Sequence, residues 1–137
     1  MILLDTNAAI AIITGRPPAV RHRNAVALAS GESVAISAVV AFELWFGALH
    51  SSQRERNSAS LRRFLSSLHD ILPFDAEDAA TAAEIRSHLA ASGKPIGPYD
   101  LLIAAQALRR GALLITANPA EFARVPHLRC QDWSANK

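Results

Sequence analysis

The chain begins with an apolar run that ends on a carboxylate. Residues 2–4 are Ile-Leu-Leu, Asp-Thr-Asn follows at 5–7, and apolar residues then resume. This pattern is typical of a short strand over residues 2–5 that enters the core. A charge at the end of a buried strand costs free energy unless a partner compensates it. We expect the partner of Asp5 to be a divalent metal ion shared with acids far away in the sequence, although an Asx-type turn at 5–7 would also account for it.

Further along the chain, short apolar strands alternate with helical patterns that are separated by glycine and proline. At 33–37, Val34 and Ile36 alternate with other residues, which predicts a strand with one apolar face. The predicted helices cover residues 7–14, 18–30, 38–49, 59–68, 76–91 and 98–110, with a short helical turn at 119–124. The other predicted strands cover residues 71–74 and 112–116, and the tail at 127–133 is a candidate edge strand.

The alternation of strands and helices predicts an α/β protein with a mostly parallel sheet. The 137 residues contain no internal repeat or evident linker, so we expect a single domain over residues 1–137. No apolar run reaches the ~18 residues of a membrane span, and the N-terminus lacks the pattern of a secretory signal. We therefore expect a cytoplasmic protein with no membrane partner. The single cysteine, Cys130, fits a reducing compartment.

The positive charge of the chain is carried almost entirely by arginine. The net charge is +2, and only Lys94 and Lys137 among the 14 basic residues are lysines. Arginine binds phosphate groups through a planar, bidentate fork, so this composition favours a nucleic-acid partner. A GC-rich genome that favours arginine codons would explain it equally well.

Several polar residues fall where an α/β sheet places its functional sites, beyond the carboxyl ends of the strands. Asp5 follows the first strand, and Asn118 lies two residues after the last apolar strand. Asp100 lies in the first turn of a helix, after a loop that contains glycine and proline. Glu43 is the one acid in an otherwise apolar helical stretch. Taken singly, Asp100 could be a helix-dipole partner and Glu43 a solvated surface residue.

Three acids in one pocket suggest a magnesium-type site. Ionised carboxylates that lie a few ångströms apart raise one another's pKa, and a hard dication relieves that repulsion. Such an ion activates water and neutralises charge on a phosphoryl group. Other chemistries have less support, because the sequence has no phosphate-binding glycine loop, no zinc-type spacing of its five histidines, and no GxSxG elbow.

Four segments together carry a family resemblance. LLDTN at 3–7, AFELWFGA at 41–48, GPYDLLIAAQA at 97–107 and LLITANPAEFARVPHLRCQDW at 113–133 resemble the PIN-domain ribonucleases, and among them the VapC toxins of bacterial toxin–antitoxin modules. The resemblance implies a three-layer α/β/α fold with a central parallel sheet of four to five strands. It also implies an endoribonuclease toxin that depends on Mg²⁺ or Mn²⁺, inhibits translation and growth, and leaves 5′-phosphate and 3′-hydroxyl ends.

The resemblance assigns roles to individual residues. Asp5, Glu43 and Asp100 match the acids of the family's metal site. Many members have a fourth acid where this chain has Asn118. The Asn118 amide would still coordinate the metal or hold a metal-bound water, but it brings no negative charge, so the site would hold a single metal or Glu121 would take part of the role. Two hydroxyl-bearing residues match positions that orient acids or water, although the first could equally cap a helix: Thr6 and Thr116.

The resemblance also implies partners. Toxins of this type form homodimers, are silenced by a cognate VapB-type antitoxin, and meet operator DNA only through that antitoxin. The candidate walls of an antitoxin groove are Trp45, Phe46, Leu61 and Phe64, and Gly47 would allow a helix to approach closely. The candidate contacts with RNA or antitoxin are Arg16, Arg21, Arg23, Arg54, Arg56 and Arg86.

Three alternatives to an RNA-cleaving toxin stay open. A nuclease of the same fold could act in RNA maturation or on DNA. A non-catalytic interaction module could retain the fold without the fourth acid. A receiver-like or phosphatase domain is the third alternative, but such domains usually carry two aspartates near the first strand, where this chain has Asp5 alone.

Overall fold

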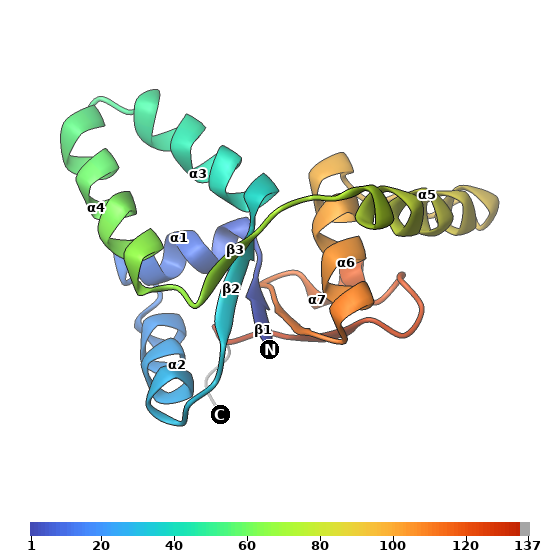
Figure 1. Cartoon of the computed structure of the whole chain (residues 1–137), viewed down its shortest axis with the longest axis horizontal. Helices are drawn as coiled ribbons and strands as arrows, with labels where there is room; N and C mark the ends of the chain where they lie inside the picture. Colours follow the sequence, from blue (N-terminus) through green and yellow to red (C-terminus); the bar gives the residue numbers. More distant parts are fainter. Residues whose placement is uncertain (135–137) are drawn as a thin grey trace.

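A five-stranded parallel sheet lies at the centre of the structure, a computed structural model that describes residues 1–134 (Figure 1). The strand order is β3-β2-β1-β4-β5. The central strands β1 and β2 are buried at every residue, as expected for a sheet covered on both faces. The bounds of the strands are β1 (Ile2–Leu4), β2 (Val34–Ser37), β3 (Asp70–Leu72), β4 (Leu113–Ile115) and β5 (Arg129–Gln131).

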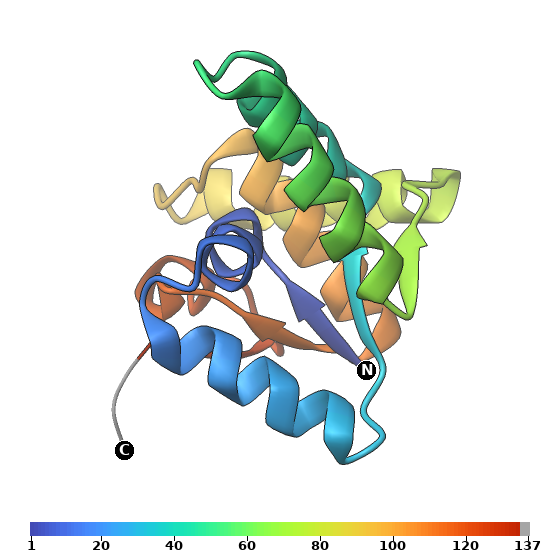
Figure 2. The same cartoon turned by 90° about the vertical axis from the view of Figure 1, so that its left-hand side faces the viewer.

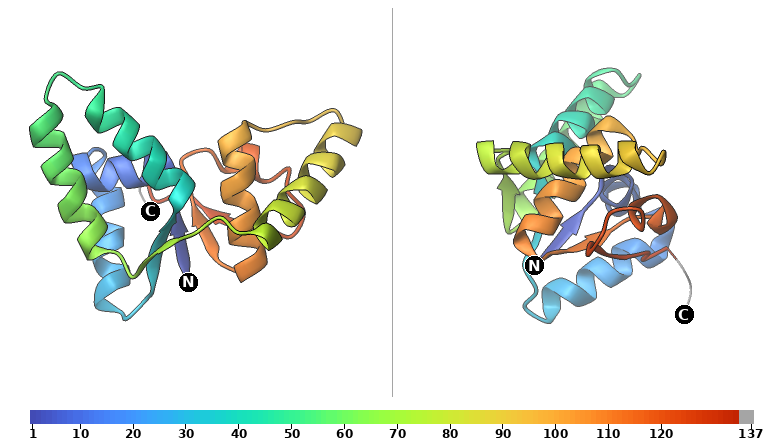
Figure 3. Two further views of the ribbon diagram at one scale, coloured as in Figure 1. Left: turned by 45° about the horizontal axis from the view of Figure 1, so that its top comes forward. Right: turned by 90° about the vertical axis from the view of Figure 1, so that its right-hand side faces the viewer.

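Helices cover both faces of this sheet and complete three layers. Figures 1 and 2 show α1 to α4 on one face, with α3 and α4 packed as an antiparallel pair. Figure 3 shows α5, α6 and α7 on the other face. The bounds of the helices are α1 (Thr6–Thr14), α2 (Pro18–Ala29), α3 (Ala38–Leu49), α4 (Arg54–Ser67), α5 (Ala76–Ala91), α6 (Pro98–Arg110) and α7 (Pro119–Phe122). The predicted α/β class and the parallel sheet are confirmed.

The path of the chain creates a switch point between β1 and β4. From β1 the chain moves outward through β2 to β3, and it then crosses to β4 on the other side of β1. In open α/β sheets, sites form beyond the carboxyl ends of the strands at such a reversal. The register pairs Leu4 with Ile115 and Ile115 with Gln131. The next residues along these strands are therefore neighbours at the carboxyl edge: Asp5, Thr116 and Asp132.

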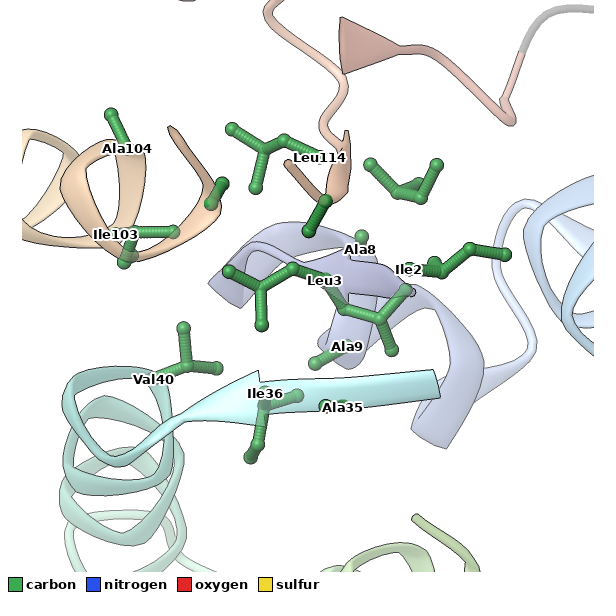
Figure 4. Close-up of a cluster of buried hydrophobic side chains, with 14 of the residues drawn as sticks. Ile2, Leu3, Ala8, Ala9, Ala35, Ile36, Val40, Ile103, Ala104 and Leu114 are labelled. Carbon is green, nitrogen blue, oxygen red and sulfur yellow. The ribbon is translucent and has the colours of Figure 1, made fainter. Parts of the chain in front are cut away.

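The core that holds this edge in place is aliphatic. Leu3, Ile36 and Leu114, from the three central strands, are completely buried. Figure 4 shows these side chains gathered with Ala8 and Ala9 of α1 and with Ile103 and Ala104 of α6. The small alanines let both helices pack close to the sheet, which fixes the first turn of each helix near the carboxyl edge.

A buried polar network fixes α6 against α5. Asp78 is completely buried and forms a reciprocal capping box with Asp75 at the start of α5. The guanidinium of Arg109 bridges Asp75, Glu77 and Asp78, and Arg110 reaches Asp78 over 3.1 Å. Because a buried carboxylate needs such partners, this network sets the relative position of the two helices.

Three expectations from the sequence need correction. Helix α4 begins at Arg54 and not at Ala59, because the polar stretch before Ala59 forms a solvated helical turn in which the Asn57 N–H donates to the Gln53 carbonyl. Strand β3 spans Asp70–Leu72 rather than 71–74. Strand β2 was predicted to have one apolar face, but it is buried on both faces, because helices also cover the face opposite Val34 and Ile36. Within residues 1–134, no helix has the length and apolar character needed to cross a membrane.

Candidate functional site

Asp5 lies at the junction of β1 and α1. It is the N-cap of α1, and its Oδ1 accepts a 2.8 Å hydrogen bond from the Ala8 N–H. Its own N–H donates to the Ile115 carbonyl over 3.0 Å, so the sheet continues to this residue. Only 6% of Asp5 is exposed. The capping bond explains why an aspartate is tolerated here, but it occupies only one of the two carboxylate oxygens.

Glu43 of α3 reaches the same junction. Its Oε1 accepts a 2.7 Å hydrogen bond from the hydroxyl of Thr6, the first residue of α1. Since Asp5 is the cap, Thr6 is not a capping residue, and its side chain instead fixes the direction of the Glu43 carboxylate. Glu43 is half-buried in this position, so it is not the freely solvated surface acid of the alternative interpretation.

Asp100 and Glu121 meet around Gly97 on the other side of the switch point. A β-carbon on Gly97 would lie 3.4 Å from Asp100 Oδ2 and 4.0 Å from Glu121 Oε1. The Gly97 N–H donates to Glu121 Oε1 over 3.1 Å. The missing side chain at residue 97 thus leaves room for two carboxylates beside the first turn of α6.

Asn118 supports this pair from the loop after β4. Its Nδ2 donates to Glu121 Oε2 over 2.7 Å, and its N–H donates to the buried Thr116 hydroxyl over 3.0 Å. The structure therefore places Glu121 beside Asp100, with Asn118 holding it there.

The electrostatics agree with a cluster of uncompensated acids. Burial, followed by the charges of Glu121, Asp5 and Glu43, raises the pKa of Asp100 to about 6. Burial also raises the pKa of Asp5; hydrogen bonds with Thr116 and the Ala8 N–H oppose that effect, and Glu43 adds to it. In the part of the chain that the structure describes, the salt bridges all belong to the Arg109–Arg110 network, so no cation is paired with these acids.

Asp132 is a further acid near the site that the sequence patterns did not identify as a candidate. It follows β5 directly and neighbours Thr116 in the extended register, and its charge contributes to the raised pKa of Asp5. Ser134 holds its Oδ1 through both its N–H and its hydroxyl. The sequence did contain a signal for Asp132, since residues 127–133 were predicted as an edge strand. Sites in parallel sheets lie beyond the carboxyl ends of the strands, and this rule applies to the residue after β5 as it does to Asp5.

The acids offer the hard oxygen donors that Mg²⁺ and Mn²⁺ bind. Over residues 1–134, no three histidine, cysteine, aspartate or glutamate side chains are gathered closely enough to form a ready-made ligand set. The expected triad of Asp5, Glu43 and Asp100 is thus not preassembled, which is consistent with the mutual repulsion of the three carboxylates. Mg²⁺ usually takes only one or two protein carboxylates and keeps several waters, so the donor set present fits such an ion.

An open groove runs from Glu43 between α1, α3 and α4. We call this cavity of about 550 Å³ the α3–α4 groove. Its floor is apolar and its rim is polar, and its lining residues include Ile13, Leu44, Leu61, Arg16, Arg56 and Asn57.

Of the four expected groove walls, Leu61 lines this cavity and three residues lie outside it. Phe64 is buried in the core, Trp45 packs under the Arg62 guanidinium, and Phe46 projects from α3 to stack on His50. Gly47 lines the groove, but a β-carbon there would meet no atom within 4 Å. It therefore leaves the groove open rather than allowing two helices to touch.

The candidate arginines differ in their surroundings. Arg21 is used inside the fold, because its Nε and Nη2 donate to the Ile12 and Ile13 carbonyls at the end of α1. Arg23 packs over the ring of Trp133. Arg16 and Arg56 line the α3–α4 groove, whereas Arg86 is exposed on α5, in the opposite helix layer.

Comparisons with known proteins agree with this architecture. Residues 2–128 match the PIN domain family. The chain is 42% identical to the tRNA(fMet)-specific endonuclease VapC of Shigella flexneri over 96% of this chain and 97% of that protein. It superimposes with a TM-score of 0.88 and 37% identity on the structure of VapBC2 from Rickettsia felis bound to a promoter DNA fragment, covering 97% of this chain and 99% of the other. DNA-bound VapBC from Salmonella typhimurium gives a TM-score of 0.87 and 38% identity over 97% and 99% of the two chains. The chain therefore belongs to the PIN-domain family and groups within it with the VapC proteins.

Proposed function

We propose that this protein is the endoribonuclease toxin of a toxin–antitoxin module and that its activity depends on Mg²⁺ or Mn²⁺. The observation that carries the proposal is the arrangement of Asp5, Glu43 and Asp100 around the switch point of the sheet. The VapC relatives named as endonucleases and ribonucleases support RNA as the substrate. The protein would then act on RNA in the cytoplasm.

Each acid has a role that follows from its surroundings. Asp5, whose Oδ1 accepts the capping bond, would hold the ion together with Asp100. Glu43, fixed by Thr6, would complete the ligand shell or orient the attacking water. Asn118 and Glu121 support Asp100, and Thr116 supports Asp5. A bound Mg²⁺ or Mn²⁺ would supply an acidified water and neutralise charge on the phosphate.

The partner proposed for the α3–α4 groove is the C-terminal segment of a VapB-type antitoxin. Solved relatives include VapBC complexes, two of them with DNA, which supports an antitoxin partner that carries the DNA contact. The groove has an apolar floor, basic residues on its rim, and Glu43 at one end. A peptide with apolar anchors and acidic side chains would fill it and cover the acids.

We also propose a homodimer, formed through an exposed apolar row on α3 and the start of α6. Phe42, Phe46 and Tyr99 are 54%, 56% and 45% exposed, Leu49 is 41% exposed, and the rings of Phe42 and Tyr99 meet edge to face. With roughly 200 Å² for each large side chain, this row offers about 400 Å² of apolar surface. That is close to the non-polar share of the ~800 Å² that a standard interface buries on each partner.

Cleavage assays separate this proposal from its rivals. Purified protein is incubated with RNA and with DNA, with Mg²⁺ or with EDTA, and compared with Asp5→Asn, which preserves the helix cap. We expect RNA cleavage only by the wild type with metal. Cleavage of DNA would favour the other nuclease function. Growth arrest that survives Asp5→Asn on expression would favour a non-catalytic module and would overturn the proposal.

A further inference from the structure

Arg16 lies between two cavities that contain residues of the acid site. The α3–α4 groove contains Glu43, and a second cavity of about 280 Å³, which we call the C-terminal pocket, contains Thr116 and Asp132. Among residues 1–134, the two cavities share two lining residues, Ile10 and Arg16. A chain that passes from one cavity to the other across the acid site must therefore pass this arginine.

The turn that carries Arg16 is held rigidly. Gly15 adopts a left-handed conformation, with φ of 73°, at the end of α1, and the Arg16 N–H donates to the Thr14 hydroxyl. Two prolines, at 17 and 18, fix the backbone that follows. The guanidinium of Arg21 packs under Gly15 and binds the last carbonyls of α1. The backbone of Arg16 thus loses little entropy when its side chain binds a ligand.

The guanidinium of Arg16 is available for binding. It is exposed, and among the described residues it takes part in no hydrogen bond or salt bridge. Five acids lie around the switch point of the sheet and influence one another through their charges: Asp5, Glu43, Asp100, Glu121 and Asp132. A polyanion that approaches these acids needs a cation beside its phosphates, and an arginine fork meets a phosphate with two parallel hydrogen bonds.

We propose that Arg16 is a positioning residue that binds a backbone phosphate of the RNA next to the cleaved linkage. This proposal rests on the proposed function and adds to it the path of the substrate, from the α3–α4 groove across Ile10 and Arg16 into the C-terminal pocket. A peptide confined to the α3–α4 groove does not reach the C-terminal pocket, where Thr116 and Asp132 of the acid site lie. The position of Arg16 between the two cavities therefore fits an extended chain that continues past the groove, as a single-stranded RNA does.

The test is the salt dependence of RNA binding by Arg16→Gln. Fluorescence anisotropy with a labelled single-stranded RNA is measured in EDTA between about 50 and 200 mM salt, where binding is independent of cleavage. Loss of one phosphate contact lowers the slope of log affinity against log salt by about 0.7 and weakens binding about tenfold. With Mg²⁺, KM for RNA cleavage rises by a similar factor while kcat stays within about twofold. Arg16→Lys recovers part of the binding.

Arg129→Gln is the matched control, because it removes the same charge from an exposed site at the start of β5, at the edge of the sheet opposite the acid site. It leaves the slope and KM at the wild-type values. An unchanged slope and KM in Arg16→Gln would overturn the proposal. If that variant also bound the antitoxin more weakly than the wild type, Arg16 would belong to the antitoxin interface instead. Absence of cleavage by the wild type, with the slope change still present, would instead refute the proposed function alone.

Discussion

A single hydroxyl determines where the Glu43 carboxylate points. The Thr6 hydroxyl donates to Glu43 Oε1 over 2.7 Å. This hydrogen bond joins the start of α1 to α3 at the acid site. Because like charges surround Glu43, the carboxylate would otherwise turn away from Asp5 and Asp100. The position of the acid therefore depends on a neutral neighbour.

Thr6→Val is expected to lower the rate of RNA cleavage about tenfold, because supporting hydrogen bonds of this kind typically contribute that much to activity. The free energy of unfolding should change by no more than about 1 kcal/mol. Cleavage rates and urea denaturation measure the two effects. Thr6→Ser keeps the hydroxyl and should retain most of the activity, whereas equal activity in the valine variant would show that Glu43 needs no such support.

Gly15→Ala is expected to destabilise the fold by about 1–2 kcal/mol. Its φ of 73° strains any L side chain, and the new β-carbon would lie 2.8 Å from Arg21 Nη1, displacing the guanidinium that closes α1. Gly47→Ala in α3 is the control, since its β-carbon meets no atom within 4 Å. That change should stabilise the protein by about 0.5–1 kcal/mol in the same denaturation experiment. Equal effects at the two positions would rule out the strain at Gly15.

At the scale of elements, the network between α5 and α6 controls the placement of Asp100. Burial alone would raise the pKa of Asp78, but the Asp75 N–H and the guanidinium groups of Arg109 and Arg110 lower it to about 2. Since Arg109 and Arg110 end the helix that Asp100 begins, the network anchors α6 at the end opposite the acid site.

This depressed pKa makes stability depend on pH in the acid range. The contribution of Asp78 is fully present above pH ~3.8 and is lost as the pH falls through about 2, because protonation of the carboxylate breaks the network. The advantage of the wild type over Asp78→Asn should therefore shrink by about 2 kcal/mol between pH 5 and about 2. Urea denaturation at each pH measures it. A constant difference between the two proteins across this range would contradict the assignment.

The sequence predicted elements better where they depend on local signals. Helices α5 and α6 begin and end at the predicted residues, because Asp75, Pro98 and Gly111 are strong local signals. The start of α4 was missed, since no capping side chain marks it. Asp132 was missed because its relation to Asp5 exists only through the sheet register, which pairs β5 with β4 across a gap in sequence. The same non-local origin explains why the sequence alone could not show which face of α3 lines the α3–α4 groove.

At the scale of the whole molecule, the exposed apolar row on α3 predicts a dimer. Phe46→Glu places a charge in the centre of the row and should convert the protein to a monomer at micromolar concentration, as measured by sedimentation velocity. Val26→Glu is the control, because Val26 is 52% exposed on α2 and Phe46 is 56% exposed on α3. A monomeric wild type, or a Phe46→Glu variant that remains dimeric, would refute this interface.

Mn²⁺ binding is the most direct test of the site itself. Electron paramagnetic resonance of free and bound Mn²⁺ is compared for the wild type, Asp5→Asn, Asp100→Asn and the control Asp70→Asn, which changes an exposed acid at the β3 edge. We expect the first two variants to lose at least tenfold in affinity, because each removes one charged ligand, and we expect Asp70→Asn to bind as the wild type does. Wild-type affinity in both Asp5→Asn and Asp100→Asn would show that these acids hold no ion.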